Sequence, residues 1–191
     1  MGKLVVSEMI SIDGVIEDPG GAEGFERGGW AFQFDQGPEA MQLKFQELMD
    51  AEALLLGRVT HEEFAKAWPT MERTGEFGER MNSMPKHVVT STLRELEWTN
   101  ARALDGDLVP AVNARRAALG GDVLVNGSAQ LVRALVEHDL VGEYRLTVFP
   151  IVLGAGKRLF AGTAAATSLI ESRPLGDDGV LLVTYRPTAR S

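Results

Sequence analysis

The sequence predicts an α/β fold in which a mainly parallel sheet is covered by helices on both faces and carries antiparallel strands at one edge. Through the first three quarters of the 191-residue chain, short apolar segments alternate with segments of helical periodicity. Near the C-terminus, three strand-like segments follow one another. Alternation is typical of parallel strands joined by helices, whereas consecutive strands pair in antiparallel fashion.

The composition fits one domain over residues 1–191, because 45% of the residues are hydrophobic and 24% are charged. No apolar run approaches the roughly 18 residues of a membrane span, and the N-terminus lacks the layout of a signal peptide. We therefore expect a cytoplasmic protein with no membrane partner. The net charge of −8 argues against nucleic acid as a partner. Cysteine is absent and the three histidines are scattered, so we expect neither disulfides nor a metal site.

In the first half of the chain, apolar periodicity and boundary residues define the expected elements. A Thr-x-x-Glu capping box predicts a helix that begins at Thr60 and ends near Trp68. Residues 11–29 contain six glycines and are expected to form a loop, whose part from 18 to 29 closes over a site. The other expected elements are strands at 3–10, 53–57 and 86–92 and helices at 38–50 and 74–83.

In the second half, Asp107 is expected to cap a helix over 108–119. Pro150 lies within an apolar segment and predicts a bulge or a sheet edge there. The other expected elements are a weak strand at 101–104, a strand at 122–125, a helix after Ser128 with Leu131, Val132, Leu135 and Val136 on one face, and strands at 144–154, 167–172 and 179–187.

Four of the predicted strands end in small polar residues or glycine. Because ligands bind at the C-terminal ends of the strands of such a sheet, these ends are expected to form one rim. Hydroxyls, helix N-termini and an arginine at that rim favour a phosphorylated ligand. The four segments are Ser11–Gly14, Gly57–Thr60, Thr90–Thr92 and Asn126–Gln130.

Two of these features keep a simpler alternative. The Asn-Gly-Ser turn at 126–128 can be a phosphate site, or a tight turn in which Ser128 caps the next helix. Arg58 can bind a phosphate or be an ordinary surface cation. Neither a GxGxxG fingerprint after the first strand nor a P-loop motif is present, which argues against both of those nucleotide-binding classes.

Five segments together resemble the dihydrofolate-reductase-like family, and most of all the reductase domain of the riboflavin-biosynthesis deaminase–reductase in its stand-alone form. In order along residues 3–186 they read SIDGVI, LLLGRVTHEEF, KHVVTST, DVLVNGSAQLVRAL and LTVFPIVLGAGKRLF. The resemblance implies a three-layer fold with a central mixed sheet, NADPH as cofactor, a small-molecule substrate and a homodimer. Residues 144–153, read as a long edge strand, would then serve in the dimer interface.

The resemblance also implies roles for individual residues. It places NADPH on two glycine-containing motifs and on a Ser/Thr turn. The implied cofactor-binding residues are Gly57, Arg58, Thr60, Ser91, Thr92, Asn126, Gly127, Ser128, Ala129 and Gln130.

The implied substrate end contains Asp13, which would orient the substrate or manage a proton, or else would merely cap an Asp-Gly turn. Trp30, with Phe32 and Phe34, could form a stacking wall for a planar substrate or pack into the core. The other implied substrate-binding residues are Gly14, Gly154 and Lys157, with Gly156 in the same loop.

Two departures from the family pattern leave the function open. No deaminase zinc motif is present, and the acid of true dihydrofolate reductases would fall at Met41, with Asp35 and Glu39 nearby but not at that spacing. We expect a reductase that transfers a hydride from NADPH to a planar or ribityl-type substrate, similar to 5-amino-6-(5-phosphoribosylamino)uracil reductase. The alternatives are a nucleotide- or flavin-binding protein without turnover and an atypical dihydrofolate reductase. Arg58 and the Ser/Thr turn favour NADPH over NADH.

Overall fold

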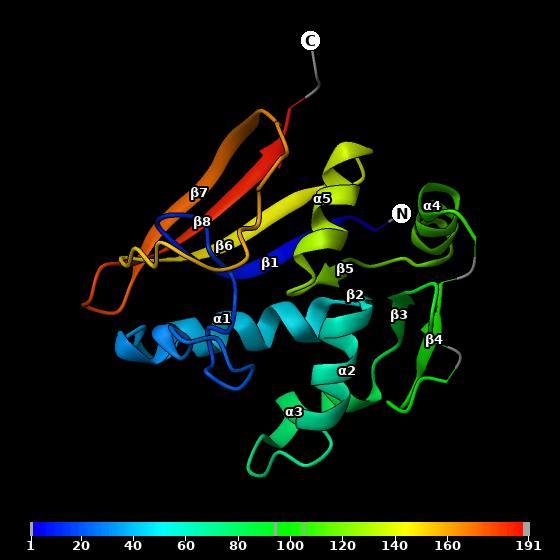
Figure 1. The fold of residues 1–191 in the computed structure, drawn as a ribbon, viewed down its shortest axis with the longest axis horizontal. Helices are drawn as coiled ribbons and strands as arrows, with labels where there is room; N and C mark the ends of the chain where they lie inside the picture. The colour runs from blue at the N-terminus through cyan, green and yellow to red at the C-terminus, as the bar shows by residue number, and fades with distance from the viewer. Residues whose placement is uncertain (1, 94, 105, 189–191) are drawn as a thin grey trace.

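A computed structural model describes residues 2–93, 95–104 and 106–188, which form one eight-stranded sheet with helices on both faces (Figure 1). Every neighbouring pair of strands from one edge through β6 is parallel, and β8 is antiparallel to both of its neighbours. The predicted fold class is therefore confirmed. In spatial order the strands are β4 (Ala101–Ala103), β3 (Lys86–Val89), β2 (Ala53–Gly57), β5 (Val123–Val125), β1 (Leu4–Ser11), β6 (Glu143–Phe149), β8 (Val180–Pro187) and β7 (Thr167–Leu175).

The sheet separates two groups of helices, which gives the fold its three layers (Figure 1). α1 (Gly37–Asp50), α2 (Arg58–Ala67) and α3 (Gly75–Ser83) cover one face, where Leu48 and Met81 pack on Leu54 and Leu56 of β2. α4 (Leu108–Ala118) and α5 (Ala129–Glu137) cover the other face. A short 3₁₀ helix, η1 (Trp30–Gln33), precedes α1.

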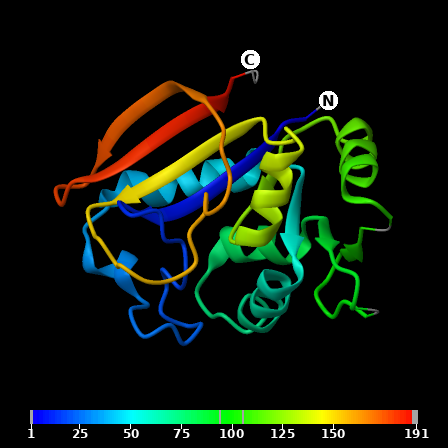
Figure 2. The ribbon, with the colours of Figure 1, turned by 45° about the horizontal axis from the view of Figure 1, so that its top comes forward.

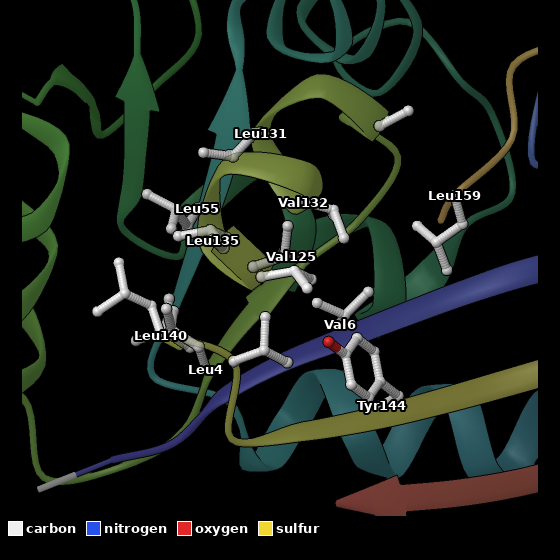
Figure 3. Close-up of a cluster of buried hydrophobic side chains, with 14 of the residues drawn as sticks. Leu4, Val6, Leu55, Val125, Leu131, Val132, Leu135, Leu140, Tyr144 and Leu159 are labelled. Carbon is white, nitrogen blue, oxygen red and sulfur yellow. The ribbon is translucent and has the colours of Figure 1, made fainter. Parts of the chain in front are cut away.

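The apolar face of α5 supplies much of the core on its side of the sheet (Figure 3). The four residues predicted to share that face are all buried: Leu131, Val132, Leu135 and Val136. They pack against β1 and β5, and burial of such a side chain stabilises the fold by about 1.5–3 kcal/mol. This packing fixes the N-terminus of α5 at the C-terminal end of β5.

The short strand β5 creates an opening in the middle of the sheet. β1 pairs with β5 only as far as Val6, which is opposite Val125, whereas its pairing with β6 continues to Ser11. On the other side, β2 pairs with β5 only at Ala53 and Leu54. Beyond Val125, the inner edges of β1 and β2 therefore face each other without a strand between them.

Three sequence-based expectations about the elements were wrong. Asp107 occupies the N-cap position of α4, but its side chain makes no cap hydrogen bond. β6 ends at Phe149, before Pro150, and lies between β1 and β8, so residues 144–153 do not form an edge strand (Figure 2). The edges of the sheet are β4 and β7, and the homodimer stays a prediction. α2 begins at Arg58 rather than at Thr60, and no side chain caps it.

Within the described ranges, no helix is both long enough and apolar enough to cross a membrane.

Candidate active site

A cavity of about 860 Å³ occupies the opening between β1 and β2, at the C-terminal ends of β2, β3 and β5. Its walls include all ten residues that the sequence assigned to the cofactor, so three of the four predicted strand ends meet at one rim, and the fourth, Ser11–Gly14, does not line it. Lys157, from the expected substrate end, also lines the cavity. Asp13, Gly14, Trp30 and Gly154 do not.

The Asn126–Ser128 turn is held to three neighbouring elements. The Asn126 side-chain amide donates to the Ser7 carbonyl of β1 at 2.8 Å. Ser128 Oγ accepts the Gly57 amide hydrogen at the end of β2 at 2.9 Å, and the Ser128 amide donates to Thr60 Oγ1 of α2 at 3.0 Å. Ser128 occupies the N-cap position of α5, but its hydroxyl makes no cap hydrogen bond. The hydroxyls of Ser128 and Thr60 thus order the cavity wall instead of capping their helices.

Two helix N-termini open onto this wall. Neither α2 nor α5 has a side-chain cap, and their first residues line the cavity. Gly127 has a φ of 58°, and a Cβ at that position would lie 3.1 Å from Thr60, so a bulkier residue would be both strained and crowded. Free amide N–H groups and positive helix ends favour anions. The residues present therefore fit the pyrophosphate of a dinucleotide.

Two arginines lie on the same wall. Arg58 lines the cavity and pairs with Glu62 at 2.7 Å, and its side chain is 45% exposed. Arg133 of α5 also lines the cavity, and its buried Nε has no hydrogen-bond partner among the described residues. Sequence analysis missed Arg133, although it lies five residues after Ser128 on the same helix.

The opposite wall, formed by β1 and α1, is rich in charge. Lys44 Nζ donates to Ser7 Oγ at 2.5 Å, and Ser7 Oγ donates to Glu47 Oε2 at 2.6 Å. Lys44 also pairs with Glu47 at 3.2 Å, and Arg145 reaches the other oxygen of that carboxylate at 3.3 Å. The acid that α1 presents to the cavity is therefore Glu47, fully engaged by its partners, and Met41 is 70% exposed elsewhere on the helix.

Glu8 is the second acid on this wall, and sequence analysis did not single it out. It is only 7% exposed, it lines the cavity, and its buried Oε1 has no hydrogen-bond partner among the described residues. Burial raises the pKa of the Glu8 carboxyl well above its usual range; Lys44 and the Gly127 amide oppose this effect. The signal in the sequence is one glutamate, the only charged residue, within the strand LVVSEMIS.

Asp13 has a different place from the one expected. Its carboxylate accepts the Ser11 hydroxyl at 2.7 Å and the backbone amide of Gly154 at 2.8 Å. Leu153 N and Arg158 Nη2 complete the set at 3.1 and 3.2 Å. Although burial alone would raise the pKa of Asp13, these hydrogen bonds outweigh it and hold the pKa well below its usual range. In this structure the Asp13 carboxylate holds two loops together outside the cavity, and its contact with the substrate stays a prediction.

Gly14 and Gly154 belong to the same loop packing. Both have positive φ values, of 84° and 73°, which lets the two chain segments turn around the Asp13 carboxylate. Neither glycine lines the cavity, and their contact with the substrate stays a prediction. Lys157, in contrast, lines the cavity and pairs with Glu17 at 2.7 Å, a contact that raises the pKa of its ammonium group.

Trp30 lies in the core and cannot stack on a ligand. It is fully buried against Phe149, with ring centroids 5.2 Å apart, and its indole N–H donates to the Glu17 carbonyl at 2.9 Å. Phe34 packs on Phe149 as well, and Phe32 is exposed. Two of the aromatic residues expected to form a stacking wall, Trp30 and Phe34, thus belong to a small hydrophobic core beneath residues 11–29. Of residues 11–29, Pro19 and Glu23 are among those that line the cavity.

The comparisons with known proteins now identify the family. The model of the RibD C-terminal domain matches residues 2–181. The chain belongs to this family.

Three known proteins are similar to this family member along nearly their whole length. An uncharacterized Bacillus subtilis (strain 168) protein, YyaP, is 24% identical over 96% of this chain and 94% of its own. The crystal structure of a candidate riboflavin biosynthesis protein from Shewanella sp. PV-4 matches with a TM-score of 0.74 at 22% identity, over 98% of this chain and 99% of that one. Dihydrofolate reductase from Enterococcus faecalis, in complex with NADP(H), matches with a TM-score of 0.60 at 17% identity, over 98% of both chains. The dihydrofolate-reductase-like fold implied by the sequence is thereby confirmed.

Proposed function

We propose that this RibD C-terminal domain is an NADPH-dependent reductase of a small substrate with a planar ring or a ribosyl group. The observation that carries the proposal is the pair of uncapped helix N-termini, α2 and α5, which meet at one cavity around Gly127. A dinucleotide pyrophosphate needs such donors and close backbone approach. The dihydrofolate reductase with the same fold binds NADP(H), which supports the same cofactor here.

In this proposal the chain's own residues bind and orient, and bound NADPH supplies the hydride. The amides of α2 and α5 and the hydroxyls of Thr60 and Ser128 hold the pyrophosphate. Arg58 neutralises a phosphate on the adenosine side, near the Thr90–Thr92 turn. The substrate then occupies the charged half of the cavity, between β1, α1 and Lys157. Polar groups there suit a ligand with many oxygen and nitrogen atoms, such as 5-amino-6-(5-phosphoribosylamino)uracil.

Thermal unfolding with NADPH, NADH, FMN or no ligand tests the cofactor. A ligand at about 100 times its dissociation constant stabilises the fold by about 2.7 kcal/mol, a shift of several degrees. We expect this shift with NADPH. Arg58→Ala is expected to weaken NADPH binding about tenfold and NADH binding much less, because the guanidinium contacts the additional phosphate. Arg102→Ala removes an exposed arginine outside the cavity and is the matched control.

A shift with FMN alone would contradict the proposal and indicate a flavin-binding protein. Oxidation of NADPH that depends on 5-amino-6-(5-phosphoribosylamino)uracil would support the reductase. Oxidation that depends on dihydrofolate instead would indicate an atypical dihydrofolate reductase.

A further inference from the structure

The course of β1 places Glu8 beside the phosphate-binding wall. The pairing of β1 with β5 stops at Val6 and Val125, so Glu8, two residues further, is level with Gly127. Alternation along the strand puts Glu8 on the same face as Val6 and Ile10, which pack in the core beneath α5. Since β5 has ended, the edge of β1 at Glu8 borders the cavity instead of a neighbouring strand.

Glu8 differs from the buried acids Glu47 of α1 and Glu143 of β6, because one of its oxygens has no hydrogen-bond partner among the described residues. Glu47 is held by Ser7, Lys44 and Arg145, and Glu143 by Lys3, Arg145 and Arg186. For Glu8, in contrast, Oε1 is buried without a partner in the described part of the chain. A buried carboxyl group with one oxygen left without a partner favours its protonated form, because a charge that is only partly compensated is costly to bury.

The charged groups around Glu8 come from several elements. Lys44 and Glu47 approach it from α1, Glu23 approaches from residues 11–29, and Gly127 directs its amide toward it from the turn after β5. Lys157, Glu17 and Glu63 line the same cavity. Glu47 and Glu23 favour the neutral form of Glu8, whereas Lys44 and the Gly127 amide favour the charged form, and burial dominates.

We propose that Glu8 is the catalytic acid of this site, the group that donates the proton that accompanies hydride transfer. This inference rests on the proposed function. The substrate contains a carbonyl or imine double bond, whose carbon accepts the hydride that NADPH supplies. As the new C–H bond forms, the π electron pair moves to the oxygen or nitrogen atom. That atom takes the proton from the Glu8 carboxyl, and the resulting carboxylate regains a proton from solvent.

The sequence position of Glu8 explains why the site needs no acid at Met41. The donor comes from the strand at the floor of the cavity and not from the helix at its side. The Asp13 carboxylate accepts four hydrogen bonds, which favour its ionised form, so Asp13 cannot donate the proton.

The protonation of Glu8 can be measured without any substrate. Infrared spectroscopy of the wild-type protein near pH 7 should show the carbonyl stretch of a protonated carboxyl group, and Glu8→Gln should lack it. Glu143→Gln is the matched control, because Glu143 is equally buried but its partners lower its pKa, so the band should persist. Absence of the band from the wild-type protein, or its persistence in Glu8→Gln, would overturn the proposal.

Steady-state kinetics then test the role, with 5-amino-6-(5-phosphoribosylamino)uracil as the probe. Glu8→Gln keeps the size and polarity of the side chain but cannot transfer a proton, so we expect kcat to fall about 100-fold or more. The wild-type kcat should fall as pH rises through the pKa of Glu8, and the variant should lack that limb. Glu137→Gln, at the exposed end of α5, is the control that should leave the profile unchanged.

The outcomes separate this inference from the function on which it rests. A higher KM with an unchanged kcat in Glu8→Gln would make Glu8 a binding group and overturn the acid role. NADPH binding measured by thermal shift should be the same in Glu8→Gln and wild type. If the wild-type protein binds no NADPH or does not turn over the probe, the reductase assignment fails and the acid role falls with it, even if the infrared band is present.

Discussion

Strand β1 and the loop that follows it hold carboxyl groups in opposite environments. At the loop after β1, Asp13 is surrounded by donors from its own loop and from residues 153–158, more than 130 positions away along the chain. Within β1, Glu8 has the carboxyl oxygen Oε1 buried with no partner among the described residues. The difference follows from what lies opposite each residue: two tight loops with free amides face Asp13, whereas an opening in the sheet lies beside Glu8. The backbone groups around an acid, more than its residue type, determine whether its carboxyl group is hydrogen-bonded within a loop or left with an unpartnered oxygen at the cavity.

The largest effect that would test this comparison is the loss of Asp13. Asp13→Ala leaves the Leu153 and Gly154 amides and the Arg158 guanidinium without their acceptor, so we expect the free energy of unfolding to fall by about 3 kcal/mol. Urea unfolding measures it. Asp177→Ala, in the exposed turn before β8, should change stability by less than about 0.5 kcal/mol. NADPH affinity should stay the same, and a large loss of affinity with unchanged stability would return Asp13 to the site.

The next effect has the opposite sign. Glu8→Met replaces a buried, partly unpartnered carboxyl group with an apolar side chain of similar length, so we expect the free energy of unfolding to rise by about 1 kcal/mol. The same variant should lose activity, because methionine cannot donate a proton. Functional residues commonly lower the stability of the fold in this way. Urea unfolding and kinetics on one preparation measure both. A destabilised Glu8→Met would show that the carboxyl group has a structural partner after all.

The smallest effect is the dependence of stability on pH. The pKa of Glu8 is raised in the folded state, so the folded protein keeps a proton that the unfolded chain loses above about pH 4.5. The free energy of unfolding therefore falls as pH rises from about 4.5 toward the raised pKa of the folded state. Because the pKa of Asp13 is lowered, its contribution to stability is lost as pH falls below about 4. Urea unfolding from pH 3 to pH 8 should therefore show Glu8→Gln gaining on wild type toward high pH. Asp13→Asn should approach wild type toward low pH, and parallel profiles for the three proteins would refute both assignments.

The sequence predicted one half of the cavity better than the other, for a physical reason. The Asn126–Ser128 turn and the start of α2 are local features, and each directly follows a strand of the parallel sheet, so their meeting was readable from the chain. The partners of Asp13 are remote in sequence, and no local pattern announces them. Glu8 resembles an ordinary polar residue of a half-exposed strand. Its burial depends on the register between β1 and β5, which places Glu8 beyond the end of β5, and the register of two strands so far apart in sequence is not visible in a local pattern.

The same remoteness explains the error at Trp30. An aromatic cluster in a glycine-rich segment is typical of a ligand-stacking surface and equally of a small core, and only the position of Phe149 on β6 distinguishes them. The placement of β6 inside the sheet was missed because Pro150 was read as interrupting a strand that in fact ends one residue earlier. Sequence periodicity thus predicted the elements well and their neighbours less well.

The three-residue strand β5 has a mechanical consequence. It lies between a five-residue and an eight-residue strand, and beyond Val125 the Asn126–Ser128 turn links the two neighbouring strands, through Gly57 at the end of β2 and Ser7 of β1. A ligand bound in the opening beyond β5 would contact both β1 and β2 and so resist movement of one strand relative to the other. Amide hydrogens at the far ends of β1 and β2 should consequently exchange more slowly in both strands when this opening is filled, although β5 separates the two strands in the sheet.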